Sequence, residues 1–374
     1  MTWPTVLLGE VASFLNGGTP SRARPEFFEG NIPWITGADI LVADKFVNTS
    51  RSCISDDGIK HSATNLVPAG TVLLVTRTGV GKAAIAGMDL AFSQDITAVL
   101  PDPQRVDRDF LLHALRHESP RYKSLAQGAT IKGITREVVE STVLPLPPIE
   151  EQRRIASILD AADALRTKRR QALAKLNTLT QSIFIDMFGD PCSNDVRYVR
   201  RSVGDLALNE DAKRVPVKMS DRALVSGTYP YYGASGVIDY VDDYLFEGQR
   251  LLVAEDGANL LARSSPVAFL ANGKFWVNNH AHVLADNGEA NLTFLRQAIE
   301  SLDLVPFVTG SAQPKLTRKM LDSVAVPAPP RSAQDEFEAR VQALRLVETA
   351  STQCLEHLDA LFASLQHRAF RGEL

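Results

Sequence analysis

The sequence predicts an α+β fold in which two β-rich globular domains are separated by two long α-helices that pack as an antiparallel coiled coil. Two observations carry this prediction. The stretch from residue 149 to residue 188 contains neither Pro nor Gly and is rich in good helix formers. A similar stretch recurs near the C-terminus at one constant offset. Such an internal repeat defines the architecture as domain, helix, domain, helix, with a pseudo-two-fold relation between the halves.

The first long helix is preceded by prolines at residues 145, 147 and 148, which stop the preceding element because Pro lacks an N–H and restricts its neighbour. Arg169 interrupts an otherwise apolar seam, so packing there is either weak or specially paired. At a rise of 1.5 Å per residue the helix is roughly 60 Å long, which suits a spacer or an interaction rod. The seam residues recur at steps of three and four: Ile155, Ile158, Ala162, Leu165, Leu173, Leu176, Leu179 and Ile183.

The second copy lies 182 residues downstream, the offset from Gln152 to Gln334. Chance similarity between two amphipathic helices is the alternative, but it does not explain why prolines and a Thr-Arg pair share that offset. The repeat predicts target domains at 1–144 and 191–326 and spacer helices at 145–190 and 327–374. The other matched pairs are Pro145 with Pro327, Pro147 with Pro329, Leu173 with Leu355, Leu176 with Leu358, Phe188 with Phe370, Gly128 with Gly310, Thr135 with Thr317 and Arg136 with Arg318.

Length and composition fit this layout. A chain of 374 residues is too long for one typical core and suggests two or three domains. Its N-terminus lacks a signal-peptide pattern, and no uncharged run approaches membrane-spanning length. The three cysteines are widely separated, which favours reduced thiols and a cytoplasmic location. A net charge of −4 leaves nucleic-acid binding open, because phosphate contact needs only a local basic face.

Residues 1–142 read as short buried strands cut by Gly and Pro, in the segments IPWITGADI, TVLLVTRTGVGKAAIAG and DITAVLP. The segment DRDFLLHALRHES reads as a short helix capped by Asp107 or Asp109. Residues 196–326 repeat this order, with TYPYYGASGVIDY, GQRLLVAEDGANLLAR and FWVNNHAHVLAD in the corresponding places. Because the strand frame is kept while the polar loops differ, the two domains should bind two versions of one kind of ligand.

Several of these segments together resemble a known family. The passages LPLPPIEEQRRIASILD, NGGTPSR, IPWITGADI, YPYYGASG and HRAFRGEL are similar to the specificity (S) subunit of type I restriction-modification systems, over the whole chain. The helix start PPxxEQ is the most specific of them, although the second copy keeps the Gln and loses the Glu pair. The resemblance implies a DNA-reading subunit that assembles with two modification (methyltransferase) subunits and with restriction (motor and endonuclease) subunits. It implies no cofactor on this chain and places S-adenosylmethionine, ATP and Mg²⁺ on the partners.

Two readers separated by a rigid rod would read two half-sites of double-stranded DNA around an unread gap, and different loops predict an asymmetric target. The candidate DNA contacts lie in polar, Gly-bounded loops, where a solvated loop residue is an equally good interpretation of each. In the first domain they are Thr19, Ser21, Arg22, Thr36, Arg77, Thr78, Lys82, Gln127 and Lys132, and in the second Tyr232, Ser235, Asn259, Arg263, Asn279, His280, Gln313 and Lys315. The candidate partner-binding residues on the first helix are Arg153, Arg154, Lys168 and Arg169.

Other patterns are weaker. The stretch from Arg77 to Lys82 is too short for a P-loop and is followed by Ala rather than Ser or Thr. His113 and His117 stand four apart on the predicted helix, where an ordinary helical surface is a better interpretation than zinc. His280 and His282 alternate as on a strand, and a DNA-facing or packed histidine is the better interpretation there. We therefore predict no metal site.

The sequence also lacks catalytic motifs. It contains no Asn/Asp-Pro-Pro-aromatic motif of amino-methyltransferases, no GxGxxG and no Walker motif. No pair of carboxylates has an evident acid–base geometry. We therefore predict a non-catalytic subunit. The alternatives are a coiled-coil structural or interaction protein without DNA readout, and a stand-alone enzyme of unknown chemistry.

Overall fold

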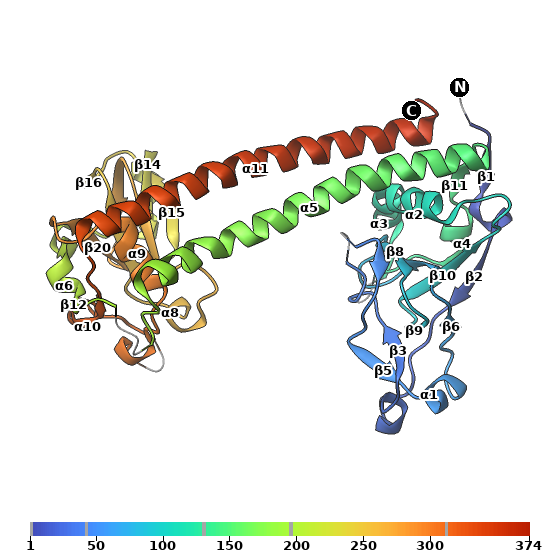
Figure 1. Ribbon diagram of the computed structural model, residues 1–374, viewed down its shortest axis with the longest axis horizontal. Coiled ribbons are helices and arrows are strands. Elements are labelled where there is room, and N and C mark those ends of the chain that lie inside the picture. The colour runs from blue at the N-terminus through green and yellow to red at the C-terminus, as the bar shows by residue number, and fades with distance from the viewer. Residues whose placement is uncertain (1–2, 42–43, 129–131, 194–196, 311–312) are drawn as a thin grey trace. The chain divides into compact units, whose positions relative to one another are not determined.

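The computed structural model describes residues 3–41, 44–128, 132–193, 197–310 and 313–374 (Figure 1). The chain divides into two compact units, one formed by Met1–Gln171 with Gln353–Leu374 and the other by Ala172–Thr352. Each unit therefore combines a globular domain with part of both long helices. Within the described residues, no helix is long and apolar enough to cross a membrane.

Unit 1 is built on a five-stranded sheet in the order β2-β10-β7-β8-β4. Strand β7 is buried along its whole length, as its continuous apolar sequence predicts. Its neighbours β10 and β8 are antiparallel to it, and β4 runs parallel to β8. The strands are β2 (Ala12–Asn16), β10 (Ile96–Pro101), β7 (Val72–Val75), β8 (Ala83–Ala86) and β4 (Phe46–Val47).

A second sheet of unit 1 has the order β5-β3-β9-β6, and a separate strand pair joins β1 to β11. The members are β5 (Ser52–Ile54), β3 (Ile32–Ile35), β9 (Leu90–Phe92), β6 (Leu66–Val67), β1 (Thr5–Leu7) and β11 (Val143–Pro145). The helices are α1 (Asp56–Lys60), α2 (Arg108–His117), α3 (Ser119–Leu125) and α4 (Arg136–Glu140), with short 3-10 turns at Leu8–Glu10 and Pro25–Phe28.

Helix α2 lies between the main sheet and the first long helix (Figure 1). Asp107 caps it by accepting hydrogen bonds from the backbone N–H groups of Asp109 and Phe110, so the capping residue is Asp107 and not Asp109. The expectation that His113 and His117 lie on an ordinary helical surface is wrong. His113 is buried and its Nε2 lies 2.9 Å from Asp160, while the half-buried His117 ring stacks on Phe370.

Unit 2 repeats the sheet arrangement of unit 1. Its sheets have the orders β13-β20-β17-β18 and β15-β14-β19-β16, with β12 paired to β21. The parallel pair β14–β19 takes the place of β3–β9. The strands are β13 (Ala207–Asn209), β20 (Ala281–Asp286), β17 (Arg250–Ala254), β18 (Ala268–Ala271), β15 (Gly236–Val241), β14 (Ser226–Gly233), β19 (Lys274–Val277), β16 (Phe246–Glu247), β12 (Arg200–Ser202) and β21 (Ala325–Pro327).

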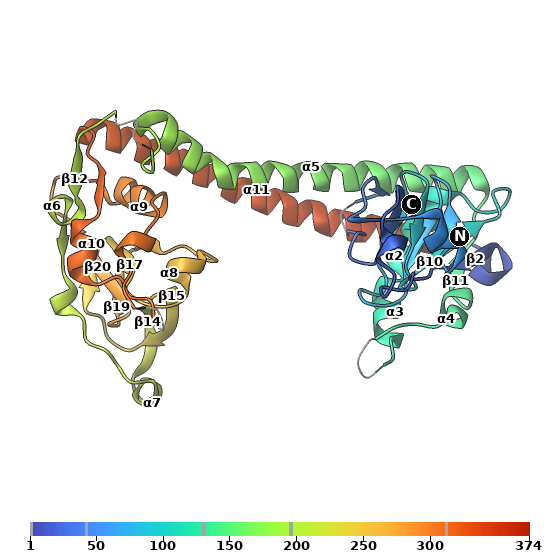
Figure 2. The same ribbon diagram turned by 90° about the horizontal axis from the view of Figure 1, so that it is seen from below.

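Helix α9 is the counterpart of α2 and lies against the start of the second long helix (Figure 2). Asn291 caps it through the N–H groups of Thr293 and Phe294, as Asp107 caps α2. The helices of unit 2 are α6 (Val203–Leu206), α7 (Met219–Arg222), α8 (Asn259–Ala262), α9 (Leu292–Glu300) and α10 (Arg318–Ser323), with 3-10 turns at Asp211–Lys213, Ala223–Val225 and Val305–Phe307. The shared sheet orders confirm the predicted tandem repeat.

The two long helices are α5 (Ile149–Phe188) and α11 (Arg331–Arg371). Within unit 1 they run antiparallel, because Arg154 near the start of α5 bonds the carbonyl of Leu374, while Arg166 further along bonds Asp359 at 2.6 Å. Arg170 shares the same carboxylate at 2.8 Å. Specially paired arginines thus hold this part of the helix pair.

Both long helices bury apolar side chains against the globular domains. In unit 2 the buried rings of Phe184 and Phe188 pack against the ring of Phe337 on α11, with ring centroids 5.6 and 5.7 Å apart. The seam positions are expected to pack helix on helix. Leu165 and Leu179 depart from this, since they are 55% and 39% exposed.

The repeated glutamines join each long helix to its globular domain. Gln152 is fully buried; its Oε1 accepts from the N–H of Asp107, and its Nε2 donates to the carbonyls of Arg105 and Pro147. Gln334 makes the same three kinds of bond in unit 2, with Asn291, Glu289 and Pro329. The Gln of the PPxxEQ motif therefore ties the capping residue of α2 or α9 to the start of the long helix.

Candidate functional site

Three loops of unit 1 meet at a backbone junction beside Arg77, which we call node 1 (residues 76–82, 93–96, 127–128 and 132–134). Gln127 and Gly133 exchange hydrogen bonds of 2.9 Å in both directions, and the N–H of Ile134 donates to the carbonyl of Thr76 at 2.9 Å. Thr76 and Arg77 both donate from their backbone N–H to the carbonyl of Asp95. The exposed side chains of Arg77, Gln127 and Lys132 therefore project from one rigid junction.

Glycines shape two loops of node 1: Gly133 in the loop after α3, and Gly79 and Gly81 in the turn between β7 and β8. A Cβ on Gly133 would lie 2.8 Å from Cγ of Arg77, so that one of the two must shift, and 3.1 Å from the Thr76 carbonyl oxygen, which is a tight contact. Thr78 has a φ of 46°, and Gly79 and Gly81 also have positive φ. The turn at residues 76–82 links the antiparallel strands β7 and β8 and not a strand to a helix, so it is not a nucleotide-binding P-loop.

Lys82 and Thr36 lie beside node 1. Lys82 Nζ donates to the carbonyl of Gly37 at 3.2 Å, which brings the loop after β3 against this turn. Thr36 donates to Asp39 at 2.8 Å, and Arg51 Nε donates to the same carboxylate at 2.7 Å. Burial alone would raise the pKa of Asp39, but the bonds from Arg51 and Thr36 outweigh burial and lower it. Sequence reasoning missed Asp39 and Arg51, which no motif links.

Thr19, Ser21 and Arg22 lie on a separate loop of unit 1. Gly17 and Gly18 hold that loop against backbone atoms of β9 and of residues 63–64, where an added Cβ would clash. Ser21 and Arg22 are exposed, and no hydrogen bond or ion pair joins them to node 1 within the residues that the structure describes. They stay candidates on their exposure alone.

Unit 2 has the same junction at the matching positions, which we call node 2 (residues 255–257, 280, 309–310 and 313–316). Thr309 and Lys315 exchange backbone bonds of 2.9 and 2.8 Å, and the N–H of Leu316 donates to the carbonyl of Glu255 at 2.7 Å. Asp256 pairs with Lys315 as Arg77 pairs with Gly133. The two junctions thus share a backbone frame while an arginine in one is replaced by an aspartate in the other.

Exposed polar side chains surround node 2. His280 lies at the start of β20 and its Nδ1 is 2.7 Å from Asp256. Lys315 reaches Glu255 at 3.1 Å, and Gln313 and Asn279 are exposed next to them in sequence. The structure therefore brings together His280, Gln313 and Lys315 from two distant stretches of the chain.

Below node 2 lies a buried network of charged side chains. His282 is fully buried, with Nδ1 2.6 Å from Asp211 and Nε2 2.7 Å from the carbonyl oxygen of Leu316. Because both ring nitrogens face oxygen acceptors, the doubly protonated ring satisfies this pattern. Arg214 bonds Glu255 at 2.7 Å. Burial would raise the pKa values of Asp211 and Glu255, but these cationic partners outweigh burial and lower both.

The same network contains residues of the kinds that bind metals. Atoms of Asp211, Glu255 and His282 lie within 4.8 Å of one another. However, Arg214 and Lys315 already pair with the carboxylates of Asp211 and Glu255. His282 Nδ1 is also hydrogen-bonded, to Asp211. A divalent cation would meet these positive charges, so the arrangement fits an ion-pair network and not a metal centre.

Other candidates of unit 2 serve internal contacts. The amide of Asn259 bonds residues 264 and 265, and Arg263 donates to the carbonyl of Leu302 at 2.5 Å. The Tyr232 ring packs against Phe269 and Phe275. Asn259, Arg263 and Tyr232 thus make contacts inside unit 2, whereas Ser235 is exposed at the turn between β14 and β15.

The candidate partner-binding residues lie on α5 in unit 1. Arg153 is exposed and pairs with Glu150 at 2.7 Å, one turn earlier on the helix. Arg154 pairs with Glu151 and also bonds the chain end, so its guanidinium is partly engaged. Lys168 is exposed and Arg169 is half-buried. Lys168 and Arg153 are thus the most accessible of the four.

The chain matches known proteins over most of its length. The signature described as the type I restriction modification DNA specificity domain matches residues 1–177 and 196–352. The MjaIX type I restriction enzyme specificity subunit of Methanocaldococcus jannaschii is 23% identical over 91% of this chain and 86% of its own. A Haemophilus influenzae protein named as such a specificity subunit is 42% identical over 35% of this chain, and the match spans only 33% of that relative.

A solved structure supports the fold as a whole. The S subunit of a type I restriction-modification system from M. genitalium aligns with 99% of this chain and 96% of its own, with a TM-score of 0.60 and 18% identity. At that level of identity the likeness concerns the fold alone.

Proposed function

This chain belongs to the type I restriction-modification DNA specificity family, and from that membership we propose that it reads a bipartite, asymmetric DNA target, one half-site per globular domain. Nodes 1 and 2 are the proposed reading elements. Each offers exposed polar side chains on a rigid backbone junction, which is the arrangement that base readout requires.

One observation carries the proposal of two different half-sites. At matching positions of the two junctions, unit 1 has Arg77 and unit 2 has Asp256. An exposed arginine can donate to guanine O6 and N7. The Asp256 carboxylate is bonded by the exposed His280, so unit 2 presents an aspartate–histidine pair where unit 1 presents an arginine. With different side chains in the same backbone frame, the two domains would select different bases. The alternative function, a coiled-coil structural or interaction protein without DNA readout, does not explain why both domains carry this junction with different side chains.

The proposed partners follow the family. The chain would act without catalysis of its own, in the cytoplasm, by placing two modification subunits and the restriction subunits on the target. S-adenosylmethionine, ATP and Mg²⁺ would be held by those subunits. The exposed side chains of Arg153 and Lys168 on α5 are proposed contacts for them. The proposed target domains are residues 1–144 and 191–326, and the proposed spacers are 145–190 and 327–374.

The direct test is binding of the assembled complex to duplexes that carry the chain's methylated target or a scrambled control. The proposal predicts selective binding that is lost when either half of the target is scrambled alone. Equal binding to target and scrambled duplexes would favour the interaction-protein alternative. Turnover of any substrate by the purified chain alone would favour the enzyme alternative.

Alanine substitution of Arg22, Arg77 and Lys132 should weaken DNA binding by the assembled complex. Each lost phosphate contact should reduce the slope of log K against log salt by about 0.9, and each lost base contact should cost about 1–3 kcal/mol. Filter binding or fluorescence anisotropy at several salt concentrations measures both quantities.

A matched control removes three other exposed cations, Lys60, Arg121 and Arg340. We expect its affinity and salt slope to equal those of the unsubstituted complex. If the Arg22, Arg77 and Lys132 variant also keeps both values, these residues do not contact DNA.

A further inference from the structure

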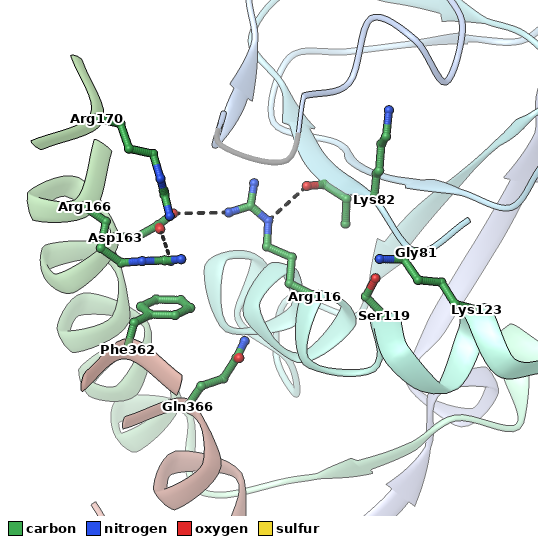
Figure 3. A pocket seen from close by; sticks show the side chains of 11 residues that line it. Gly81, Lys82, Arg116, Ser119, Lys123, Asp163, Arg166, Arg170, Phe362 and Gln366 are labelled. Atoms are coloured by element: carbon green, nitrogen blue, oxygen red, sulfur yellow. Dashed lines mark hydrogen bonds and ion pairs between the residues drawn. The ribbon is translucent and has the colours of Figure 1, made fainter. Parts of the chain in front are cut away.

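Unit 1 contains a cavity of about 410 Å³, to whose lining node 1 contributes Gly81 and Lys82. It lies where β8, α2 and α3 face α5 and α11 (Figure 3). A volume in this range suits a small ligand. The residues that line it come from all five elements and the turn before β8: Gly81, Lys82, Ala83, Arg116, Ser119, Lys123, Asp163, Arg166, Arg170, Phe362 and Gln366.

The charges of the cavity do not balance. Five lining side chains are cationic and one, Asp163, is anionic. Asp163 bonds Arg166 at 2.7 Å and lies 3.5 Å from Arg116, so one carboxylate serves two guanidinium groups. Asp359, just outside the lining, is likewise shared by Arg166 and Arg170. Arg116, Arg166 and Arg170 thus share these two carboxylates.

The other contacts of these cations are with neutral groups. Besides its pair with Asp163, Arg116 donates to the backbone carbonyls of Ala83 at 3.0 Å and Asp44 at 2.6 Å. Lys82 donates to the carbonyl of Gly37. Among the described residues, no hydrogen bond or ion pair engages Lys123 Nζ. Burial lowers the pKa of Arg116, while the charges of Asp163, Asp160 and Asp44 act in the opposite direction.

The shape of the lining adds a second feature. The Phe362 ring lies beside Arg166, whose guanidinium carbon is 4.2 Å from the ring centroid. This contact holds Arg166 in place without consuming its hydrogen-bonding capacity. In Figure 3 the guanidinium of Arg116 lies between the α5 arginines and the lysines of the β8 and α3 side. Planar guanidinium forks around a cavity are suited to phosphate oxygens.

We propose that this cavity binds phosphate, with Arg116, Arg170 and Lys123 as the groups that meet its oxygens. The phosphate belongs either to a small anion or to the backbone of DNA, and the chemistry is the same in both cases. This inference does not rest on the proposed reading of bases by node 1 and node 2.

The test titrates the full chain with inorganic pyrophosphate by isothermal titration calorimetry. The double variant Lys123→Gln, Arg170→Gln should raise the dissociation constant for pyrophosphate about ten-fold or more, because two charged donors are lost. The control Lys60→Gln removes an exposed cation far from the lining and should leave it unchanged. Thermal unfolding of each variant shows that the chain is folded during the titration.

Two results would overturn the proposal: no binding of pyrophosphate by the unsubstituted chain, or equal binding by the double variant. A competition arm then identifies the source of the phosphate. If a short DNA duplex displaces bound pyrophosphate, the cavity holds a backbone phosphate. If the duplex leaves pyrophosphate in place, the ligand is a small anion.

Discussion

Replacing Gln334 with alanine should lower the free energy of unfolding by about 2–4 kcal/mol. The side chain is 1% exposed and serves the N–H of Asn291 and the carbonyls of Pro329 and Glu289. Its removal leaves these buried groups unpaired, at a cost of about 1–3 kcal/mol for each that water cannot reach. Urea denaturation of the full chain, followed by circular dichroism, measures the change.

The corresponding change in unit 1, Gln152→Ala, should have a similar effect, because Gln152 makes the same three kinds of bond. A matched control is Gln342→Ala, which truncates an exposed glutamine on the same helix as Gln334 and should cost less than about 0.5 kcal/mol. The interpretation of the repeated glutamine as the joint between domain and helix would be refuted if Gln334→Ala and Gln342→Ala were equally stable.

Replacing His282 with leucine should destabilise unit 2 by about 3–5 kcal/mol, the range for breaking a buried pair of charges. The change removes the imidazole partner of Asp211 and the donor to the carbonyl of Leu316, which lies in node 2. Arg214 and the N–H of Val283 still contact Asp211, which favours the lower end of that range. Denaturant unfolding near pH 7 measures the loss.

The His282–Asp211 pair should also make the free energy of unfolding depend on pH. Burial acts to raise the pKa of Asp211, but the bond and charge of His282 outweigh it and hold the pKa below the ordinary value of 3.8. A carboxyl group whose pKa is lowered on folding stabilises the folded state above its ordinary pKa. That contribution is lost as the pH falls through the lower, folded value.

The difference in stability between the original chain and His282→Leu should therefore be largest above pH 3.8 and shrink below it. Unfolding curves at a series of pH values follow this difference. A difference that stays constant into strong acid would show that His282 acts by packing alone.

Much of the fold could be predicted because it follows from local patterns. The prolines at 145, 147 and 148, the absence of Pro and Gly after them and the repeat at one offset predicted both long helices. The apolar run at 72–75 predicted a buried strand, and Asp107 before an apolar segment predicted a helix start. Each of these signals lies within a few residues of the element that it specifies.

The helix seam was predicted less well. Leu165 of unit 1 and Leu179 of unit 2 fit the spacing of a buried seam but are exposed. Near Leu165, ion pairs from Arg166 and Arg170 to Asp359 join the two helices. Spacing alone does not tell a packed seam from an exposed apolar face. Likewise, four-residue spacing placed His113 and His117 on one helix face without showing that this face meets α5 and α11.

The site depends on contacts between distant stretches, which sequence reasoning on one chain reaches only in part. The Gly-bounded loops pointed to Arg77, Lys132, His280 and Lys315, and the structure places these residues at the two junctions. No local pattern distinguishes Asn259 and Arg263, whose side chains hold loops in place, from true node residues. The match between Gln127–Gly133 and Thr309–Lys315 becomes visible only through backbone pairing.

The most direct test of two unlike readers is a genome-wide map of methylated adenines in the host, with the chain intact and deleted. Our account predicts one asymmetric motif of two separated parts, with a gap of one fixed length, that disappears on deletion. A single uninterrupted motif, a pair of identical half-sites, or methylation that persists without the chain would contradict it.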